Sequence, residues 1–253
     1  MTIVKGHKAI ASPCCQTSYR TPQYSSINLS AYGYWTDGEK ESGLSPVGNG
    51  LRKCQCGAYY LLRDAVSVDC PDASGVPNAQ WVSPSDLPEA IRTASSAMVE
   101  LAARRDYWRH LNDEYRTVYR AHRDAEEAES DARWLCEWRA TLTPWQRFTQ
   151  RIKKTQSPQP PASFTRPFTI PPYAPTPEHL DNMKRLLTLI LAVSADDAWI
   201  DWLEVAELYR EQGLFQEALD ALGRYIDDHS SVTKNVLAEQ ITERVSAPIR
   251  YRM

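Results

Sequence analysis

The sequence predicts an α+β protein that is mostly α, in which a small zinc-ribbon-like β module precedes a helical bundle ending in a repeat-like αα hairpin. Three observations predict this architecture: two close pairs of cysteines lie early in the chain, apolar residues recur at helical spacing over long stretches, and a Pro-rich segment separates two helical regions. We therefore divide the chain into a β module at 1–83, long helices at 84–155, a Pro-rich linker at 156–177 and a helical region at 178–253.

The composition is that of a globular protein without a strong charge bias. The chain has 253 residues, 42% of them hydrophobic, and a formal net charge of −3, which gives no general attraction toward nucleic acid or membranes. The longest apolar run, Leu186 to Val193, is far shorter than the roughly 20 residues of a membrane span. Residues 1–12 show no apolar signal-peptide core, so we expect a cytoplasmic protein with no membrane partner and with cysteines that are thiols or metal ligands.

The β module is predicted from alternation and from turn residues. Residues 27–34 alternate between small or apolar and polar side chains, which is typical of a half-buried strand. The dipeptide Asp37-Gly38 is a turn signal, and the apolar run Ala58 to Leu62 reads as a returning strand. This strand-turn-strand segment separates the two cysteine pairs.

The candidate metal ligands are Cys14, Cys15, Cys54 and Cys56. Two sulfur clusters joined by a β excursion are how a zinc ribbon is built, so the four thiolates are expected to hold one structural Zn²⁺. The spacing departs from the Cys-x-x-Cys-Gly of a standard zinc knuckle, and adjacent side chains in an extended chain point apart unless a tight turn intervenes. A ribbon held by packing without metal is the alternative. A redox pair at Cys54 and Cys56 is less favoured, because no thioredoxin-like pattern surrounds it.

Residues 84–155 carry two apolar stripes at helical spacing. The first runs from Leu87 to Tyr119 and the second from Trp134 to Ile152. The stripes predict one long helix or an αα pair. Its break is expected near 105, within the acidic stretch 124–131, or at Thr143-Pro144.

The last third of the chain is predicted to be helical after the Pro-rich linker, which we expect to pack on the helices through its aromatic residues. Thr176 followed by Pro177 is a helix start signal. Trp202–Gln212 and Gln216–Asp228 form the predicted hairpin with Gly213 at its turn, and small residues on both helices allow close approach. One tetratricopeptide repeat has this pattern, but an ordinary bundle hairpin has it as well.

The chain as a whole resembles uncharacterised bacterial proteins that combine an N-terminal zinc ribbon, a tryptophan-rich helix and a C-terminal tetratricopeptide-like hairpin. The resemblance rests on residues 34–38 (Tyr-Trp-Thr-Asp-Gly), Cys54-x-Cys56-Gly57, Tyr107-Trp108 and the segment from Ala206 to Leu219. It covers both ends of the chain and thins between Thr117 and Pro175. The resemblance implies an architecture and no known activity.

We expect a non-catalytic protein-binding module: an adaptor, a scaffold, or an immunity protein that neutralises a toxin. The chain shows no recognisable catalytic motif, so no catalytic residue is assigned and an enzyme is less favoured. Tyr and Trp are enriched where protein interfaces carry their energy. The candidate partner-binding residues are Tyr107, Trp108, Trp134, Trp138 and Trp145. The alternative is nucleic-acid binding through the ribbon and the Arg-rich, aromatic stretch 104–123.

Overall fold

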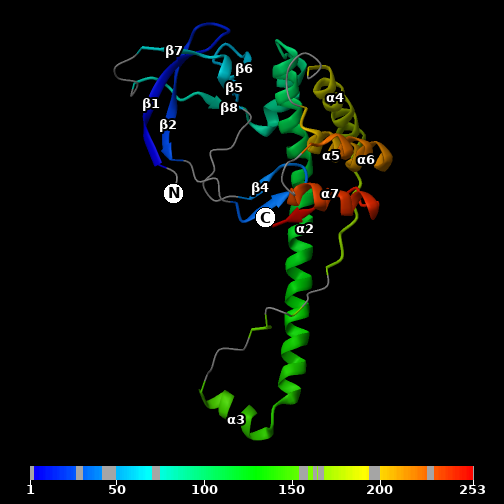
Figure 1. Ribbon diagram of the computed structural model, residues 1–253. Coiled ribbons are helices and arrows are strands. Elements are labelled where there is room, and N and C mark those ends of the chain that lie inside the picture. Colours follow the sequence, from blue (N-terminus) through cyan, green and yellow to red (C-terminus); the bar gives the residue numbers. More distant parts are fainter. Residues whose placement is uncertain are drawn as a thin grey trace. The chain divides into compact units, whose positions relative to one another are not determined.

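The computed structural model describes residues 3–26, 31–41, 50–69, 75–153, 159–161, 164, 168–193, 200–226 and 231–252, with the backbone only for 150–153. The protein is α+β with helix predominating, as the sequence predicts (Figure 1). It divides into two compact units: unit 1 comprises Met1–Asn112 and Ala174–Met253, and unit 2 comprises Asp113–Tyr173. The boundaries expected at 83, 155 and 177 stay predictions. No helix in the described part of the chain is both long and apolar enough to cross a membrane.

The helices are α1 (Leu87–Arg92), α2 (Ala97–Thr141), α3 (Pro144–Lys153), α4 (Pro177–Val193), α5 (Trp202–Glu211), α6 (Phe215–Arg224) and α7 (Val232–Thr242). The strands are β1 (Ile3–Ala11), β2 (Ser18–Ser26), β3 (Gly33–Trp35), β4 (Lys40–Glu41), β5 (Leu51–Lys53), β6 (Tyr59–Leu61), β7 (Val66–Val68), β8 (Gln80–Trp81) and β9 (Arg250–Tyr251).

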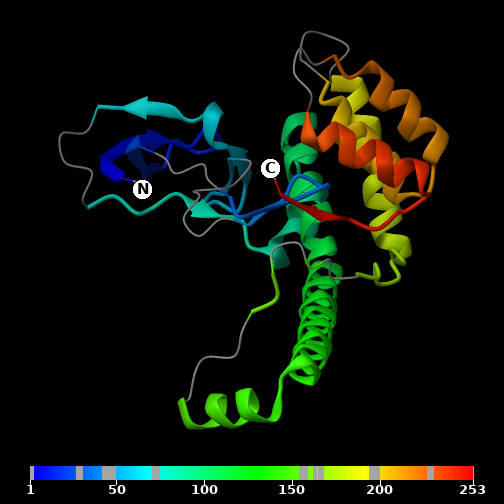
Figure 2. The same ribbon diagram turned by 60° about the horizontal axis from the view of Figure 1, so that its bottom comes forward.

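The named strands form three small antiparallel sheets, with strand orders β2-β1-β7, β4-β3-β9 and β6-β5-β8. In the first sheet Ala11 pairs with Ser18, so the turn that carries the first two cysteines joins β1 to β2. Figure 2 shows β9, at the C-terminal end of the chain, beside β3, with which it pairs. The strands β1 and β2 were not predicted from the sequence. Only the inner end of β1 is buried, so the outer part of this strand lacks an apolar pattern.

The other strand predictions have mixed outcomes. The returning strand expected at Ala58 to Leu62 is confirmed as β6. The first half of the strand expected over 27–34 lies outside the described residues, and Gly33 and Tyr34 at its end begin β3. A small core beneath the cysteines unites side chains from four parts of the module, namely Ile10, Tyr19, Cys54 and Tyr60.

Of the three expected helix breaks, only the one at Thr143-Pro144 is present, because α2 is continuous from Ala97 to Thr141. Thr143 begins α3 with a reciprocal cap. The backbone N–H of Gln146 donates to Thr143 Oγ1 at 3.3 Å, and the backbone N–H of Thr143 donates to Gln146 Oε1 at 2.9 Å. Pro144 occupies the first helical position, where its missing N–H costs nothing. A second break, not predicted, separates α1 from α2.

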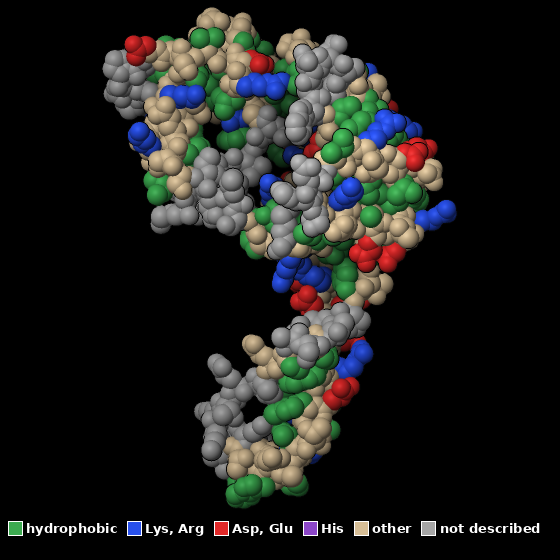
Figure 3. Space-filling model, viewed as in Figure 1, with side chains coloured by type: hydrophobic (Ala, Val, Ile, Leu, Met, Phe, Trp, Pro, Cys, Tyr) green, Lys and Arg blue, Asp and Glu red, His purple; other side chains and the backbone are tan. Residues whose placement is uncertain are grey.

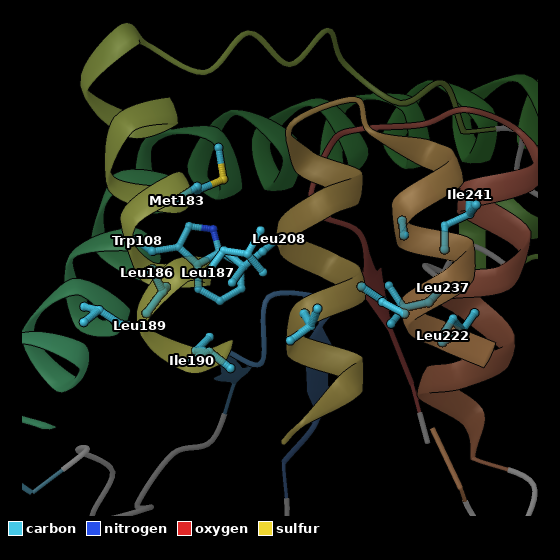
Figure 4. Packing of buried hydrophobic residues seen from close by; sticks show 14 of the residues in the cluster. Trp108, Met183, Leu186, Leu187, Leu189, Ile190, Leu208, Leu222, Leu237 and Ile241 are labelled. Atoms are coloured by element: carbon cyan, nitrogen blue, oxygen red, sulfur yellow. The ribbon is translucent and has the colours of Figure 1, made fainter. Parts of the chain in front are cut away.

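The main core of unit 1 lies between α2, α4, α5, α6 and α7 (Figure 4). Trp108 on α2 is fully buried there, beside Met183 and Leu186 of α4. Burying a side chain of this size is among the largest single contributions that a core residue makes. The prediction that Trp108 belongs to a partner-binding surface is therefore wrong.

The predicted αα hairpin is present as α5 and α6. Gly213 sits between the two helices with φ of +76°, a left-handed conformation that favours glycine. Ala206 and Ala218 are both fully buried, which lets the two helices approach closely. Asp201 caps α5 by accepting the backbone N–H groups of Leu203 and Glu204. Its kinship to a tetratricopeptide repeat stays a prediction.

Within unit 2, the Pro-rich segment packs on α2 through rings. Tyr119 and Phe168 meet edge-on with centroids 4.8 Å apart, and Tyr115 does the same with Tyr173 at 5.0 Å. The Tyr115 hydroxyl also donates to the carbonyl of Pro171 at 3.1 Å. These contacts confirm the expectation that the aromatic residues of the linker tie it to the helices.

Candidate metal centre

The first cysteine pair lies in the tight turn between β1 and β2. The backbone N–H of Ser12 donates to the carbonyl of Thr17 at 2.9 Å, and the N–H of Gln16 donates to the carbonyl of Ser12 at 3.0 Å. Gln16 has a φ of +60°, which closes the turn in a left-handed conformation. The curvature removes the objection that neighbouring cysteines must point apart, so Cys14 and Cys15 face the same site.

The second pair lies in the turn between β5 and β6. The N–H of Cys54 donates to the carbonyl of Ala58 at 2.8 Å, and the N–H of Gly57 donates to the carbonyl of Cys54 at 2.9 Å. Gly57 has a φ of +87°. A residue with a Cβ is strained in that conformation, which explains the glycine directly after Cys56. This turn brings Cys54 and Cys56 to one side with a single residue between them.

The two turns bring the four predicted ligands together. The sulfur atoms of Cys14, Cys15, Cys54 and Cys56 all lie within 4.8 Å of one another. Cys15 Sγ is 3.3 Å from Cys54 Sγ, and Cys56 Sγ is 3.5 Å from Cys14 Sγ. With Zn–S bonds of about 2.3 Å, the sulfur atoms of a tetrahedral site are about 3.8 Å apart. The observed cluster has the dimensions of such a site, so the four residues fit a metal ion.

Hydroxyl groups surround the cluster and orient the sulfur of Cys54, which is buried. The Tyr19 hydroxyl lies 3.4 Å from Cys54 Sγ and accepts the backbone N–H of Gln55 at 2.8 Å, so Tyr19 fixes both the ligand and its turn. Ser12 Oγ is 3.5 Å from the same sulfur, and Thr17 Oγ1 is 3.0 Å from Cys15 Sγ. Groups that hydrogen-bond to ligands in this way hold a site in register before the metal arrives.

The four thiols do not ionise with equal ease. Burial opposes ionisation of Cys54, but its hydrogen bonds with Ser12 and Tyr19 outweigh it and lower the pKa of Cys54 to about 5. The hydrogen bond from Thr17 lowers the pKa of Cys15. Burial, with the neighbouring Cys54, raises the pKa of Cys14 to about 12. A cation at the centre favours every thiolate at once, whereas without it the first thiolates disfavour the next.

The predicted partner-binding residues lie in different environments. Tyr107 is half-buried in unit 1, and its hydroxyl donates to Glu178 Oε1 at 2.6 Å. In unit 2, Trp134 and Trp138 are half-buried and stacked, with centroids 6.3 Å apart. Trp145 on α3 is 71% exposed. These residues belong to different units and differ in exposure, and apart from Trp108 their role in partner binding stays a prediction.

The Arg-rich stretch of α2 has its charges engaged within each unit. In unit 1, Arg104 pairs with Glu100 at 2.9 Å and Arg105 pairs with both carboxylate oxygens of Glu204. In unit 2, Arg123 pairs with Asp124 at 3.0 Å. Arginines committed to carboxylates are poor phosphate ligands, so this arrangement weighs against the nucleic-acid alternative.

A buried polar network that was not predicted from the sequence lies beneath the turn at residues 35–38. Asn112 Nδ2 donates to Asp37 Oδ2 at 3.0 Å and to Glu211 Oε1 at 3.2 Å, and the Trp108 indole donates to Glu211 Oε2 at 2.8 Å. Burial, followed by the nearby carboxylates, raises the pKa of Glu211 well above its usual value. The signal for such a network in the sequence is a polar residue, such as Asn112, that interrupts an apolar stripe.

The same turn borders a cavity of about 400 Å³ in unit 1. Its lining mixes aromatic residues such as Tyr34 and Tyr251 with charged residues of both signs, including Lys40 and Glu204. Arg105 and Glu204 neutralise each other in that lining. The cavity therefore selects no single charge of ligand.

No protein-family model, curated protein or solved structure matches this chain. The resemblance to uncharacterised bacterial zinc-ribbon proteins accordingly stays an expectation.

Proposed function

We propose that this chain is a non-catalytic, cytoplasmic protein-binding protein whose N-terminal module is held together by a structural Zn²⁺. Cys14, Cys15, Cys54 and Cys56 would be its ligands. An adaptor, a scaffold and a toxin-neutralising immunity protein are all forms of this proposal, and they differ only in the partner.

The observation that supports it best is the closed set of four sulfurs. Structural zinc sites use four protein ligands, whereas catalytic sites use three and keep the fourth position open for water or substrate. The four cysteines would leave no such position. The bound ion would neutralise the thiolates and cross-link the β1–β2 turn to the β5–β6 turn, and it would add folding energy to a module whose core is small.

Zinc is favoured over other metals by the donor atoms. Thiolates are soft ligands that select zinc, copper(I) or iron–sulfur chemistry, and four sulfurs in a tetrahedron favour zinc or a single iron. The hard cations Mg²⁺ and Ca²⁺ require oxygen ligands. The hydroxyls of Ser12, Thr17 and Tyr19 point at sulfur and so serve the ligands rather than the ion.

For the partner, we propose the surface around α6 of the repeat-like hairpin. Leu214 just before the helix, Leu219 within it and Ile226 just after it are all exposed, Ile226 by 91%. Exposed aliphatic side chains before, within and after one short helix are available for a protein partner to cover. Helical repeats bury such faces against a neighbouring repeat or a ligand.

A capture experiment tests the partner surface. The full-length chain and its L219D/I226D variant would be used as bait in the native host, with mass spectrometry as the readout. We expect a specific partner that the double variant loses. The control is V118D, which alters another exposed aliphatic residue on a helix and should retain the partner. Equal capture by all three chains would refute the α6 surface, and turnover of a substrate by the purified chain would refute a non-catalytic role.

A further inference from the structure

Helix α3 in unit 2 exposes an aromatic face. Trp145 and Phe148 are one helical turn apart, are 71% and 54% exposed, and have ring centroids 5.9 Å apart. Figure 3 shows hydrophobic side chains gathered over the part of unit 2 that Figure 1 labels α3.

The opposite side of α3 carries a basic residue. Arg147 is exposed and is two residues from Trp145, which places it on the other side of the helix. Arg151 follows four residues later in the sequence. The Thr143–Gln146 cap fixes the start of the helix, and Arg147 Nη2 donates to the carbonyl of Ala140 at 3.3 Å. The helix is therefore tied to the end of α2, and its two faces are defined before anything binds.

The basic character extends beyond the helix. From Trp138 to Pro177 the sequence contains six Lys or Arg residues and no Asp or Glu, although the whole chain has a net charge of −3. The six residues are Arg139, Arg147, Arg151, Lys153, Lys154 and Arg166. A segment with this much uncompensated positive charge attracts an anionic partner.

We propose that α3 binds the surface of an anionic phospholipid bilayer, with Trp145 and Phe148 inserted at the level of the headgroups and the net positive charge of the segment attracting the anionic lipids. Short helices with an aromatic face, a basic face and low net hydrophobicity lie in the membrane interface. This position requires no membrane-spanning segment, so it is compatible with the helix lengths described above. It goes beyond the protein-binding role, and it replaces the sequence-based expectation of no membrane partner.

The arrangement of charge and rings favours a bilayer over the other anionic partners. Single-stranded nucleic acid needs rings and cations on one face, because bases stack where their own phosphates are bound. On α3, Arg147 lies on the side of the helix opposite Trp145. A protein partner would need a carboxylate placed for each of several scattered cations, whereas an anionic membrane supplies a negative potential over its whole surface.

Vesicle co-sedimentation of the full-length chain tests the proposal. We expect binding to phosphatidylcholine vesicles containing about one third phosphatidylserine, and weak binding to phosphatidylcholine vesicles. W145A/F148A should lower the affinity by at least about tenfold, because it removes the inserted rings. R147Q and R151Q should each lower it about fivefold, and added salt should weaken wild-type binding.

Two controls separate this proposal from the proposed function. L219A/I226A alters the α6 surface and should leave vesicle binding unchanged, so each surface can fail without the other. R63Q removes an exposed arginine of the β module and should also have no effect. Equal sedimentation with both kinds of vesicle, or full binding by W145A/F148A, would overturn the proposal. Binding of an oligothymidine strand in place of the vesicles would assign α3 to nucleic acid and would overturn it as well.

Discussion

Two turns of unit 1 that end in glycine have similar backbone conformations but are stabilised by different interactions. Gly57 ends the turn that carries Cys54 and Cys56, and Gly38 ends the turn that begins at Trp35; their φ angles are +87° and +80°. The first turn directs sulfurs toward other sulfurs. The second directs Thr36 and Asp37 toward polar groups on helices, among them Asn112. The turn at Gly57 thus brings together thiols alone, whereas the turn at Gly38 places its polar groups against donors on the helices.

This difference shows where each turn obtains its stability. Neighbouring thiolates repel one another, so we expect a bound cation to stabilise the cysteine turns at neutral pH. The turn at 35–38 is anchored by the protein itself: Thr36 Oγ1 accepts from Arg210 Nη2 at 3.2 Å and from the backbone N–H of Ile249 at 3.0 Å. We expect removal of metal to loosen the first turn and leave the second in place.

Of the residues that anchor the turn at 35–38, Arg210 should have the largest effect on stability when it is replaced. Its guanidinium forms two hydrogen bonds of 2.7 Å to the carboxylate of Glu207, donates to the carbonyl of Val245, and is fully buried, as is Glu207. R210M leaves the buried Glu207 charge without its partner, and we expect it to lower the free energy of unfolding by about 3–5 kcal/mol. Chemical denaturation measures this loss.

The double variant R210M/E207L is the matched control for that change. It removes the orphaned charge together with its partner, so it should recover a large part of the lost stability. If R210M unfolds at the same denaturant concentration as the wild type, the buried contacts of Arg210 do not stabilise the turn at 35–38.

The pH dependence of stability should reveal His179, which is buried on α4. Burial lowers its pKa to about 4, with a smaller opposing effect from Asp37. Because the folded-state pKa is below the ordinary value of about 6.5, the unfolded state takes up the proton first. Stability from the neutral imidazole is thus present above pH 6.5 and is lost as the pH falls toward 4, by up to about 3 kcal/mol.

The comparison of wild type with H179Q isolates that contribution, since Glu211 and the cysteines titrate in both chains. Melting temperatures of both chains would be measured at evenly spaced pH values from pH 7 to pH 4. The wild type should lose more stability over this interval than H179Q. Parallel curves would show that His179 is protonated as easily in the folded state as in the unfolded state.

The smallest effects should come from the two glycines themselves. A Cβ on either residue is strained by its positive φ, at a cost of about 1 kcal/mol. At Gly57 nothing lies within 4 Å of such a Cβ, whereas at Gly38 it would meet Arg109 Nη2 at 3.0 Å. With zinc in excess, G38A should therefore destabilise slightly more than G57A in thermal unfolding. The reverse order would mean that the cysteine turn is the more constrained one.

The sequence predicted those features that depend on local patterns. The fold class, the hairpin at Gly213, the helix start at Thr176 and the approach of the four cysteines follow from spacing, capping residues and turn residues. Features that depend on distant segments were missed. The pairing of β9 with β3 joins the two ends of the chain, and no local pattern announces such a contact.

The burial of Trp108 could not be predicted for a similar reason. Apolar stripes show that a face is buried or binding, but they do not distinguish the two, because both faces need large apolar side chains. Trp108 is buried because α4 and α5 pack against α2 around it, whereas Trp145 is exposed and available to a partner. The identity of the metal cannot be predicted from the sequence either, because four converging thiols form a site but do not specify which ion it binds.

Metal analysis of the purified protein tests the central claim most directly. Elemental mass spectrometry should find about one zinc per chain, and C54S should lose it, whereas C136S, which alters an exposed cysteine outside the cluster, should retain it. Chelation should increase hydrogen exchange in β5 and β6 while the core around Trp108 stays protected. A chain purified without metal, whose β module remains equally protected before and after chelation, would contradict the account.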